Sequence, residues 1–170
     1  MKLTDFSVKA VKIFKGHDGN GYNCNLYLNN KKVAEIIEDG WGGGLQIHWK
    51  DSSAPKVEIN RREDATKYCQ YKGTPTEKVL VELLNDHPPC EDFDTPLYYN
   101  IDMFVDDLVN DHLEAKEFKR KCKTKTLIIT KECQKGQYIA YSRAYSPQMK
   151  DFIKKEHGSN LVKIINEDYL

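Results

Sequence analysis

Hydrophobic and polar side chains alternate along the first fifty residues, which is the pattern of half-buried β-strands. In the clearest stretch the alternating hydrophobic positions are Tyr22, Cys24, Leu26 and Leu28. Short segments rich in Asn, Asp and Gly separate four such stretches, at about 6–14, 22–29, 32–38 and 45–49. Successive strands joined by short turns predict an antiparallel β-meander, to which a strand at Val57–Ile59 would add a fifth member.

The middle of the chain changes to helical spacing. The run Thr74-Pro75-Thr76-Glu77 predicts a helix start, because the Thr and Glu side chains can bind free backbone N–H groups and proline at the first helical position has none to satisfy. That helix should end before His87. A second, longer helix is predicted from about Asn100 to about Lys121, with one hydrophobic face.

The last fifty residues predict a β-hairpin and a short helix. Two strands, 126–130 and 137–145, flank a turn, and Ser146-Pro147 starts a helix that runs through His157 to Gly158. The segment 161–165 fits a strand or a helix turn. Because no repeat or linker interrupts the chain, we expect one α+β domain over 1–170: the meander of four to five strands, two central helices, then the hairpin and short helix.

Composition narrows the class of protein. No hydrophobic run approaches the ~20 residues that span a bilayer, and the first residues carry charge rather than a hydrophobic signal segment. The five cysteines are odd in number and widely spaced, which argues against a disulfide framework and a zinc site. We therefore expect a cytoplasmic protein with no membrane partner and no cofactor.

The formal net charge is zero, but the charges are unevenly distributed. Residues 79–115 hold ten acidic side chains and no Lys or Arg. Residues 116–125 then hold six basic side chains and one acidic one. An acidic middle segment is thus followed by a basic band.

The glycine turn, Gly40 to Gly44, contains four glycines in five positions and leads into the predicted strand that carries His48. Ordering glycine is costly, so such a turn indicates φ > 0 or a close approach to the backbone. Its functional interpretation is a ligand cradle formed by Trp41, Gly42, Gly43 and Gly44. No Lys-Ser/Thr pair or helix follows, so a phosphate loop is not expected. The alternative is a wide turn over which Trp41 packs.

Charged residues suggest two further sites. Asp107, Asp111 and Glu114 share a helix face and could hold a divalent ion, or the acidic segment could mimic a DNA backbone; a solvated face is the simpler interpretation. The second site combines basic and aromatic side chains that could contact a nucleotide. Its members are Lys123, Lys125, Tyr141, Arg143 and Tyr145. The simpler interpretation here is a partly exposed sheet edge and ordinary helix-terminal lysines.

No catalytic motif is evident: the chain has no Gly-x-Ser-x-Gly elbow and no His-Glu-x-x-His. The five histidines are scattered, and His48, on the polar side of its strand, is the best catalytic candidate of a poor set. No catalytic residue is therefore assigned, and the sequence leans away from an enzyme.

Three segments carry a resemblance to a group of known proteins. Lys31-Lys32-Val33-Ala34-Glu35 before the glycine turn, Lys121 to Thr126, and Tyr145-Ser146-Pro147 resemble small uncharacterised proteins of bacteriophages and prophages. The resemblance implies action in the cytoplasm of a host bacterium and evasion of host defence. It implies no catalytic residues.

Together these observations favour a non-enzymatic binding protein, a phage-encoded inhibitor of a bacterial defence system. It would sequester a nucleotide-type signal or cap a defence protein, as a monomer or a homo-oligomer, without binding nucleic acid directly. Two alternatives stay open: a small metal-dependent hydrolase or nucleic-acid-processing enzyme, and a partial DNA mimic that uses the acidic segment.

Overall fold

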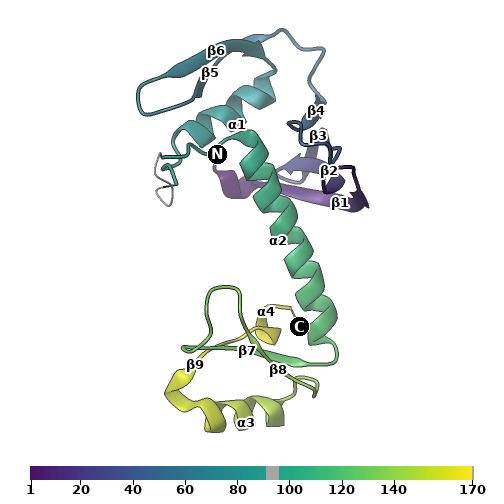
Figure 1. The fold of residues 1–170 in the computed structure, drawn as a ribbon, viewed down its shortest axis with the longest axis vertical. Helices are drawn as coiled ribbons and strands as arrows, with labels where there is room; N and C mark the ends of the chain where they lie inside the picture. Colours follow the sequence, from purple (N-terminus) through teal and green to yellow (C-terminus); the bar gives the residue numbers. More distant parts are fainter. Residues whose placement is uncertain (91–95, 170) are drawn as a thin grey trace. The chain divides into compact units, whose positions relative to one another are not determined.

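The computed structural model describes residues 1–90 and 96–169 and confirms the predicted α+β class (Figure 1). The chain divides into two compact units, Met1–His112 and Leu113–Leu170, called below the N-terminal and the C-terminal unit. Among the described residues, no helix combines the length and hydrophobicity needed to cross a membrane. The expectation of one domain over residues 1–170 stays a prediction.

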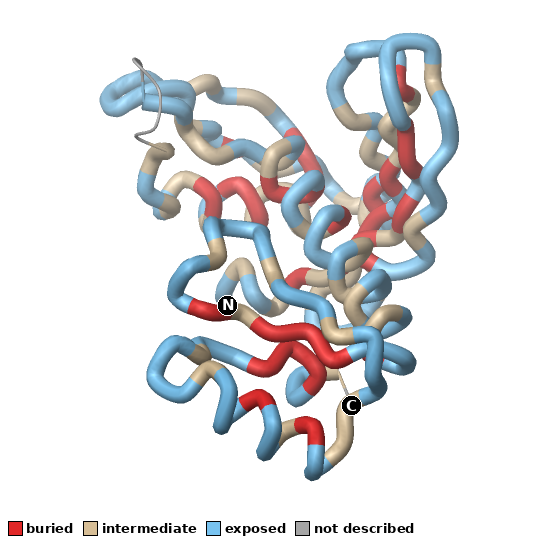
Figure 2. Tube along the Cα trace, turned by 60° about the horizontal axis from the view of Figure 1, so that its bottom comes forward, coloured by how far each residue is buried: buried red, intermediate tan, exposed pale blue. Residues whose placement is uncertain are grey.

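The N-terminal unit contains the predicted meander. After a short 3₁₀ turn (η1, Leu3–Asp5), four antiparallel strands follow in the sheet order β1-β2-β3-β4. They are β1 (Phe6–Lys15), β2 (Asn20–Leu28), β3 (Lys31–Glu38) and β4 (Gln46–Trp49). Alternate side chains are buried, as the sequence pattern requires, and they include Leu26 and Ile36. Figure 2 colours the described chain by burial.

The strand predicted at Val57–Ile59 exists but does not extend the meander. It is part of β5 (Val57–Arg62), which pairs with β6 (Tyr68–Gly73) in a separate two-stranded sheet. The sequence analysis missed β6. Only Ile59 is buried in β5, so a weak hydrophobic pattern conceals a hairpin whose stability depends on packing against a helix.

That helix is α1 (Pro75–Asn85), and it begins where predicted. The Thr74 hydroxyl accepts the Glu77 N–H at 3.1 Å, and the Glu77 carboxylate accepts the Thr74 N–H at 3.2 Å, which completes the capping box. Its buried residues Leu80, Val81 and Leu84 form the hydrophobic face of the helix.

The second helix, α2 (Ile101–Cys122), also matches its predicted range, and the boundary between the units falls within it. In the N-terminal unit its first turns bury Phe104, Val105 and Val109. The Phe104 ring packs edge-on against Phe6 of β1, with 5.9 Å between ring centroids. This contact places the first turns of α2 against the sheet.

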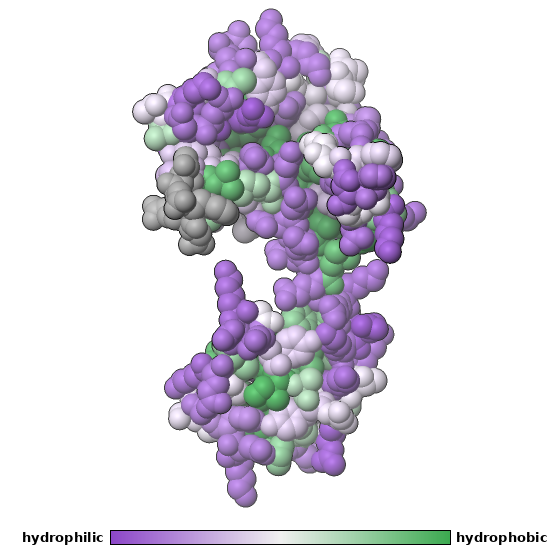
Figure 3. Space-filling view, in the orientation of Figure 1, coloured by the Kyte–Doolittle hydropathy of each residue, from purple (hydrophilic) through white to green (hydrophobic). Residues whose placement is uncertain are grey.

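In the C-terminal unit, helices cover both faces of a three-stranded antiparallel sheet. The strand order is β8-β7-β9. The elements are β7 (Thr126–Thr130), β8 (Ile139–Tyr141), α3 (Pro147–His157), η2 (Gly158–Asn160), β9 (Leu161–Ile164) and α4 (Asn166–Tyr169). Met149 and Ile153 of α3 pack on Ile128, whereas Leu127, on the opposite face, packs with Cys122 at the end of α2. Hydrophobic side chains reach the surface of this unit between hydrophilic ones (Figure 3).

Two predictions for this unit need adjustment. The strand expected at 137–145 covers only Ile139–Tyr141, so Arg143 and Tyr145 lie beyond it and do not share a strand face with Tyr141. The segment 161–165, which fitted a strand or a helix turn, forms β9 because it pairs with β7. The N-cap of α3 is confirmed, since the Ser146 hydroxyl accepts the Met149 N–H at 3.2 Å.

The outer strand of the meander has an irregular edge. Among the described strands, β1 pairs only with β2, and its register shifts between Lys9 and Lys12. Ala10, inside this bulge, takes the left-handed backbone conformation with φ = 56°. Beyond the bulge, Ile13 and Phe14 are exposed.

Candidate functional site

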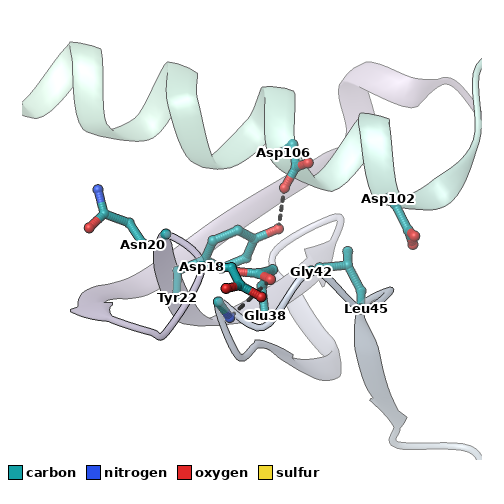
Figure 4. Close-up of a pocket in the computed structure, with 11 residues that line it drawn as sticks. Asp18, Asn20, Tyr22, Glu38, Gly42, Leu45, Asp102 and Asp106 are labelled. Carbon is teal, nitrogen blue, oxygen red and sulfur yellow. Dashed lines mark hydrogen bonds between the residues drawn. The ribbon is translucent and has the colours of Figure 1, made fainter.

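The glycine turn and the acidic helix, which the sequence analysis treated as separate candidates, meet in one cleft of the N-terminal unit. The cleft has a volume of about 350 Å³ and lies between the turn and the first turns of α2 (Figure 4). Four carboxylates line it: Asp18, Glu38, Asp102 and Asp106. None of the described lining residues is Lys, Arg or His. We call this cavity the acidic cleft.

Strand register and close backbone contacts bring its walls together. Tyr22 of β2 lies opposite Glu38 of β3, so the two side chains belong to one end of the sheet. The turn that carries Asp18 is held against the glycine turn, because the Asp18 N–H donates to the Gly40 carbonyl at 2.8 Å. A Cβ atom on Gly40 would lie only 2.8 Å from the Gly16 Cα, so glycine is required where these loops touch.

Only part of the glycine turn has the conformation that the sequence suggested for Gly42 to Gly44. Gly40 and Gly42 have φ values of 71° and 78°, whereas Gly43 and Gly44 do not have positive φ. A Cβ on Gly43 would meet nothing within 4 Å, and one on Gly44 would lie 3.4 Å from Asp102 Oδ2. Positive φ thus accounts for the glycines at 40 and 42, whereas Gly43 lines the cleft without a conformation that requires glycine.

Tyr22 connects the floor of the cleft to the helix. Its side chain is buried, and its hydroxyl donates to Asp106 Oδ1 at 2.6 Å (Figure 4). Burial, and then this hydrogen bond to a carboxylate, raise the pKa of Tyr22 well above its usual value. The Tyr22 hydroxyl therefore stays protonated and keeps donating to the Asp106 carboxylate, which lines the cavity.

Asp102 lies one helical turn before Asp106. Partial burial raises the pKa of Asp102, and the nearby charge of Asp106 raises it further. The Leu45 N–H, which hydrogen-bonds to the Asp102 carboxylate, and the positive charge of Arg61 both lower the pKa of Asp102. Neighbouring carboxylates with no basic side chain among the described residues that line their cleft are an unfavourable arrangement, which a positively charged ligand would relieve.

We predict that Asp102→Asn stabilises the protein at neutral pH by up to about 0.5 kcal/mol, because Asn keeps an acceptor for Leu45 and removes the repelled charge. A raised carboxyl pKa means that the folded state binds the proton more tightly than the unfolded state. The gain should therefore be present above the folded pKa of Asp102 and disappear as the pH falls below its unfolded value, near 3.8. Denaturant titrations of both proteins between pH 3 and pH 7 measure this difference; a gain that is constant with pH would contradict it.

An aromatic pair flanks the cleft. Trp41 is 64% exposed and stacks on the imidazole of His17, with 5.0 Å between ring centroids and 16° between ring planes. His17 Nδ1 lies 2.8 Å from Asp18 Oδ1, and Trp41 sits between the lining residues Gly40 and Gly42. Trp41 thus does not pack down over the turn but leaves a large indole face in solvent beside the carboxylates.

The other sequence-predicted site residues lie elsewhere. His48 is exposed on β4, opposite Glu35, and does not line the acidic cleft. The basic and aromatic candidates belong to the C-terminal unit: Lys123, Lys125, Tyr141, Arg143 and Tyr145. The Tyr141 hydroxyl pairs with His157 and the Tyr145 hydroxyl with Glu167, and no described hydrogen bond, ion pair or ring contact joins the five to one another.

The alternative metal site finds no support in the geometry. Asp107, Asp111 and Glu114 are exposed, and the Asp107 carboxylate accepts a hydrogen bond from Tyr99. Within residues 1–90 and 96–169, no three His, Cys, Asp or Glu side chains are grouped to hold a metal ion. Three acids of the acidic segment, Glu91, Asp92 and Asp94, lie outside the described residues.

In the sequence, Asp102 and Asp106 are spaced by four residues and so share a helix face, but nothing singled out Asp18, Tyr22 or Glu38 as site residues. The turn between β2 and β3 does not by itself place Tyr22 opposite Glu38, because the register shifts by one residue between Leu26 and Tyr27. The contact between Tyr22 and Asp106 joins residues 84 positions apart, and no local pattern reports such a contact.

Comparison of the chain with family models, with curated proteins and with solved structures finds no match. The resemblance to bacteriophage proteins therefore stays a prediction, and the function has to be argued from the site.

Proposed function

We propose that the protein is a non-enzymatic binding protein whose acidic cleft takes a cationic side chain, arginine or lysine, of a partner protein. The observation that carries the proposal is the composition of the cleft wall. Four carboxylates line about 350 Å³, and no basic side chain among the described lining residues neutralises them. A partner that supplies the cation would relieve this repulsion on binding.

The chemistry of the cleft suits a guanidinium group. Arginine donates through a planar fork that matches carboxylates bidentately, and charge-assisted hydrogen bonds of this type are stronger than neutral ones. The exposed indole of Trp41 adds a ring face beside the carboxylates on which a guanidinium or a lysine stem can stack. Tryptophan and arginine are both enriched at protein–protein interfaces.

The four carboxylates also distinguish between the two modes of action considered from the sequence, which are sequestration of a nucleotide-type signal and capping of a defence protein. A nucleotide carries phosphates that four carboxylates would repel, so the acidic cleft favours capping of a protein over sequestration of a nucleotide-type signal. That this partner is a bacterial defence protein, and that the chain is a phage-encoded inhibitor, rests on the sequence resemblance. Both belong to the proposal.

Charge removal at one cleft carboxylate tests the proposal. We expect a short arginine-containing peptide to bind the wild-type protein at low salt in isothermal titration calorimetry and to shift the NMR amide signals of Gly42 and Gly43. Asp106→Asn should weaken binding roughly fivefold, because Asn can still accept from Tyr22 but supplies no charge. Affinity should also fall at higher salt.

Two matched comparisons make this test specific. In the peptide, citrulline replaces arginine with nearly the same shape and no charge, and it should not bind. In the protein, Asp111→Asn removes an exposed carboxylate of the same helix that does not line the cleft, and it should leave affinity unchanged. Equal effects of Asp106→Asn and Asp111→Asn would refute a localised site and favour the DNA-mimic alternative.

A further inference from the structure

We propose that a second cleft, in the C-terminal unit, binds a methylated or quaternary ammonium group. This cleft has a volume of about 260 Å³. Three aromatic side chains line it together with two carboxylates: Phe118, Tyr138, Tyr169, Glu114 and Asp168. We call it the aromatic cleft. The proposal does not depend on the function proposed for the acidic cleft, because it rests on different residues.

The three rings form one cluster that is anchored on the core. Phe118 is at the centre, with its ring centroid 5.4 Å from that of Tyr138 and 5.8 Å from that of Tyr169. The ring planes are inclined by 71° in the first pair and 35° in the second, so the rings present different faces and edges. All three pack against the buried residues Cys122, Leu127 and Ile165 and are only partly buried themselves.

One ring of the cluster already contacts a cation. The Lys121 ammonium donates a hydrogen bond to the Tyr138 hydroxyl, so its Nζ, 5.1 Å from the ring centroid, lies at the hydroxyl edge of the ring and not over its face. The same ammonium is paired with Glu117. Lys121 therefore does not cover the ring faces of the cluster, and Phe118, Tyr138 and Tyr169 all line the aromatic cleft.

The carboxylates give the aromatic cleft a negative field. Burial raises the pKa of the Tyr169 hydroxyl, and the charges of Asp168 and Glu114 raise it further, which shows that both anions act on this ring. The one basic lining residue, Lys163, is paired with Asp168. Glu114 takes part in none of the ion pairs found in the described part of the chain. One unpaired negative charge thus faces the rings.

Ring-lined clefts with a nearby carboxylate favour alkylated ammonium groups over primary ones. A primary ammonium is strongly hydrated and needs acceptors for three N–H donors. A quaternary ammonium has no N–H donor, so it loses little when rings replace its water shell, while its charge is still attracted to ring faces. Phosphates fit poorly, because Lys163, the only cation among the described residues that line the aromatic cleft, is already paired with Asp168.

The test compares choline with 3,3-dimethylbutan-1-ol, which has the same shape but a carbon in place of the charged nitrogen. Each is titrated into the full chain while aromatic NMR signals are recorded. We expect choline to shift signals of Phe118, Tyr138 and Tyr169 saturably and the neutral compound to bind about tenfold more weakly. Equal binding of the two compounds, or no saturable shift with choline, would overturn the proposal.

Variants then locate the site. Tyr169→Leu should weaken choline binding about tenfold, whereas Tyr169→Phe, which keeps the ring, should bind nearly as wild type. Glu114→Gln should weaken binding about threefold without affecting the fold, because its side chain is exposed. Asp151→Asn, on α3 and outside the aromatic cleft, is the matched charge control and should bind normally. If Asp151→Asn weakened binding as much as Glu114→Gln, the attraction would be unspecific and the proposal would fail.

Discussion

Replacing Gly40 by alanine is expected to destabilise the N-terminal unit by about 3 kcal/mol, from two causes that add. Gly40 has φ = 71°, which an L residue adopts only with strain. The new Cβ would also lie 2.8 Å from the Gly16 Cα and 3.1 Å from the Gly21 nitrogen, and both of these atoms belong to the backbone. Neither contact can be relieved by a side-chain rotation, so two loops must move apart.

Tryptophan fluorescence measures this effect selectively, because both tryptophans, Trp41 and Trp49, lie in the N-terminal unit. Two neighbouring glycines provide graded controls. Gly42→Ala keeps the positive-φ strain without a clash and should cost about 1 kcal/mol, whereas Gly43→Ala has neither and should stay within about 0.5 kcal/mol of wild type. A loss at Gly43 as large as that at Gly40 would contradict the assignment of close contact to Gly16, Gly21 and Gly40.

Asn166→Ala is expected to destabilise the C-terminal unit by about 3 kcal/mol or more, because it leaves three backbone groups without partners. The Asn166 side chain has no exposed surface. Its Oδ1 accepts the Leu127 N–H at 2.7 Å, and its Nδ2 donates to the carbonyls of Cys122 and Lys125 at 3.3 and 2.8 Å. Asn166 thus satisfies a carbonyl at the end of α2 and an amide at the start of β7 at once.

Hydrogen exchange of the β7 amides measures the loss at Asn166, since this unit contains no tryptophan. Asn166→Asp should be at least as damaging, because it keeps the acceptor for Leu127 but points a carboxylate at two carbonyl oxygens. Val162→Ala, at an exposed position of β9, is the control and should change protection little. Unchanged protection of Leu127 in Asn166→Ala would show that water or a rearranged side chain replaces the three hydrogen bonds.

Most secondary-structure elements could be predicted because their signals are local. The period-2 pattern around Leu26, the capping box at Thr74 and the serine cap at Ser146 depend on residues within a few positions of one another, and each is confirmed. The hairpin of β5 and β6 was incompletely predicted, since Ile59 is its one buried hydrophobic side chain and the stabilising helix follows in the chain.

The candidate site, in contrast to these elements, could not be predicted from local signals. The glycine turn and the acidic pair Asp102 and Asp106 stand out in the sequence, but their meeting depends on the packing of α2 on a sheet end. The requirement for glycine at Gly40 likewise comes from Gly16, far outside the turn. Tertiary contacts of this kind leave no periodic pattern and no motif in the sequence. The sequence alone therefore identified the glycine turn and the acidic pair but not the cleft that they form.

The irregular edge of β1 has a consequence for self-association. An open strand edge is a template on which a second chain can add a strand, and a protein with a formal net charge of zero lacks the mutual repulsion that keeps molecules apart. In β1 the bulge at Ala10 breaks the hydrogen-bonding register halfway along this edge, and Lys9 and Lys12 flank the break. A second chain that added a regular strand to this edge would have to bury these lysines and leave the bulged residues without hydrogen-bond partners. The left-handed alanine thus makes the β1 edge a poor template for strand addition, an effect that mutual charge repulsion adds to in more highly charged proteins.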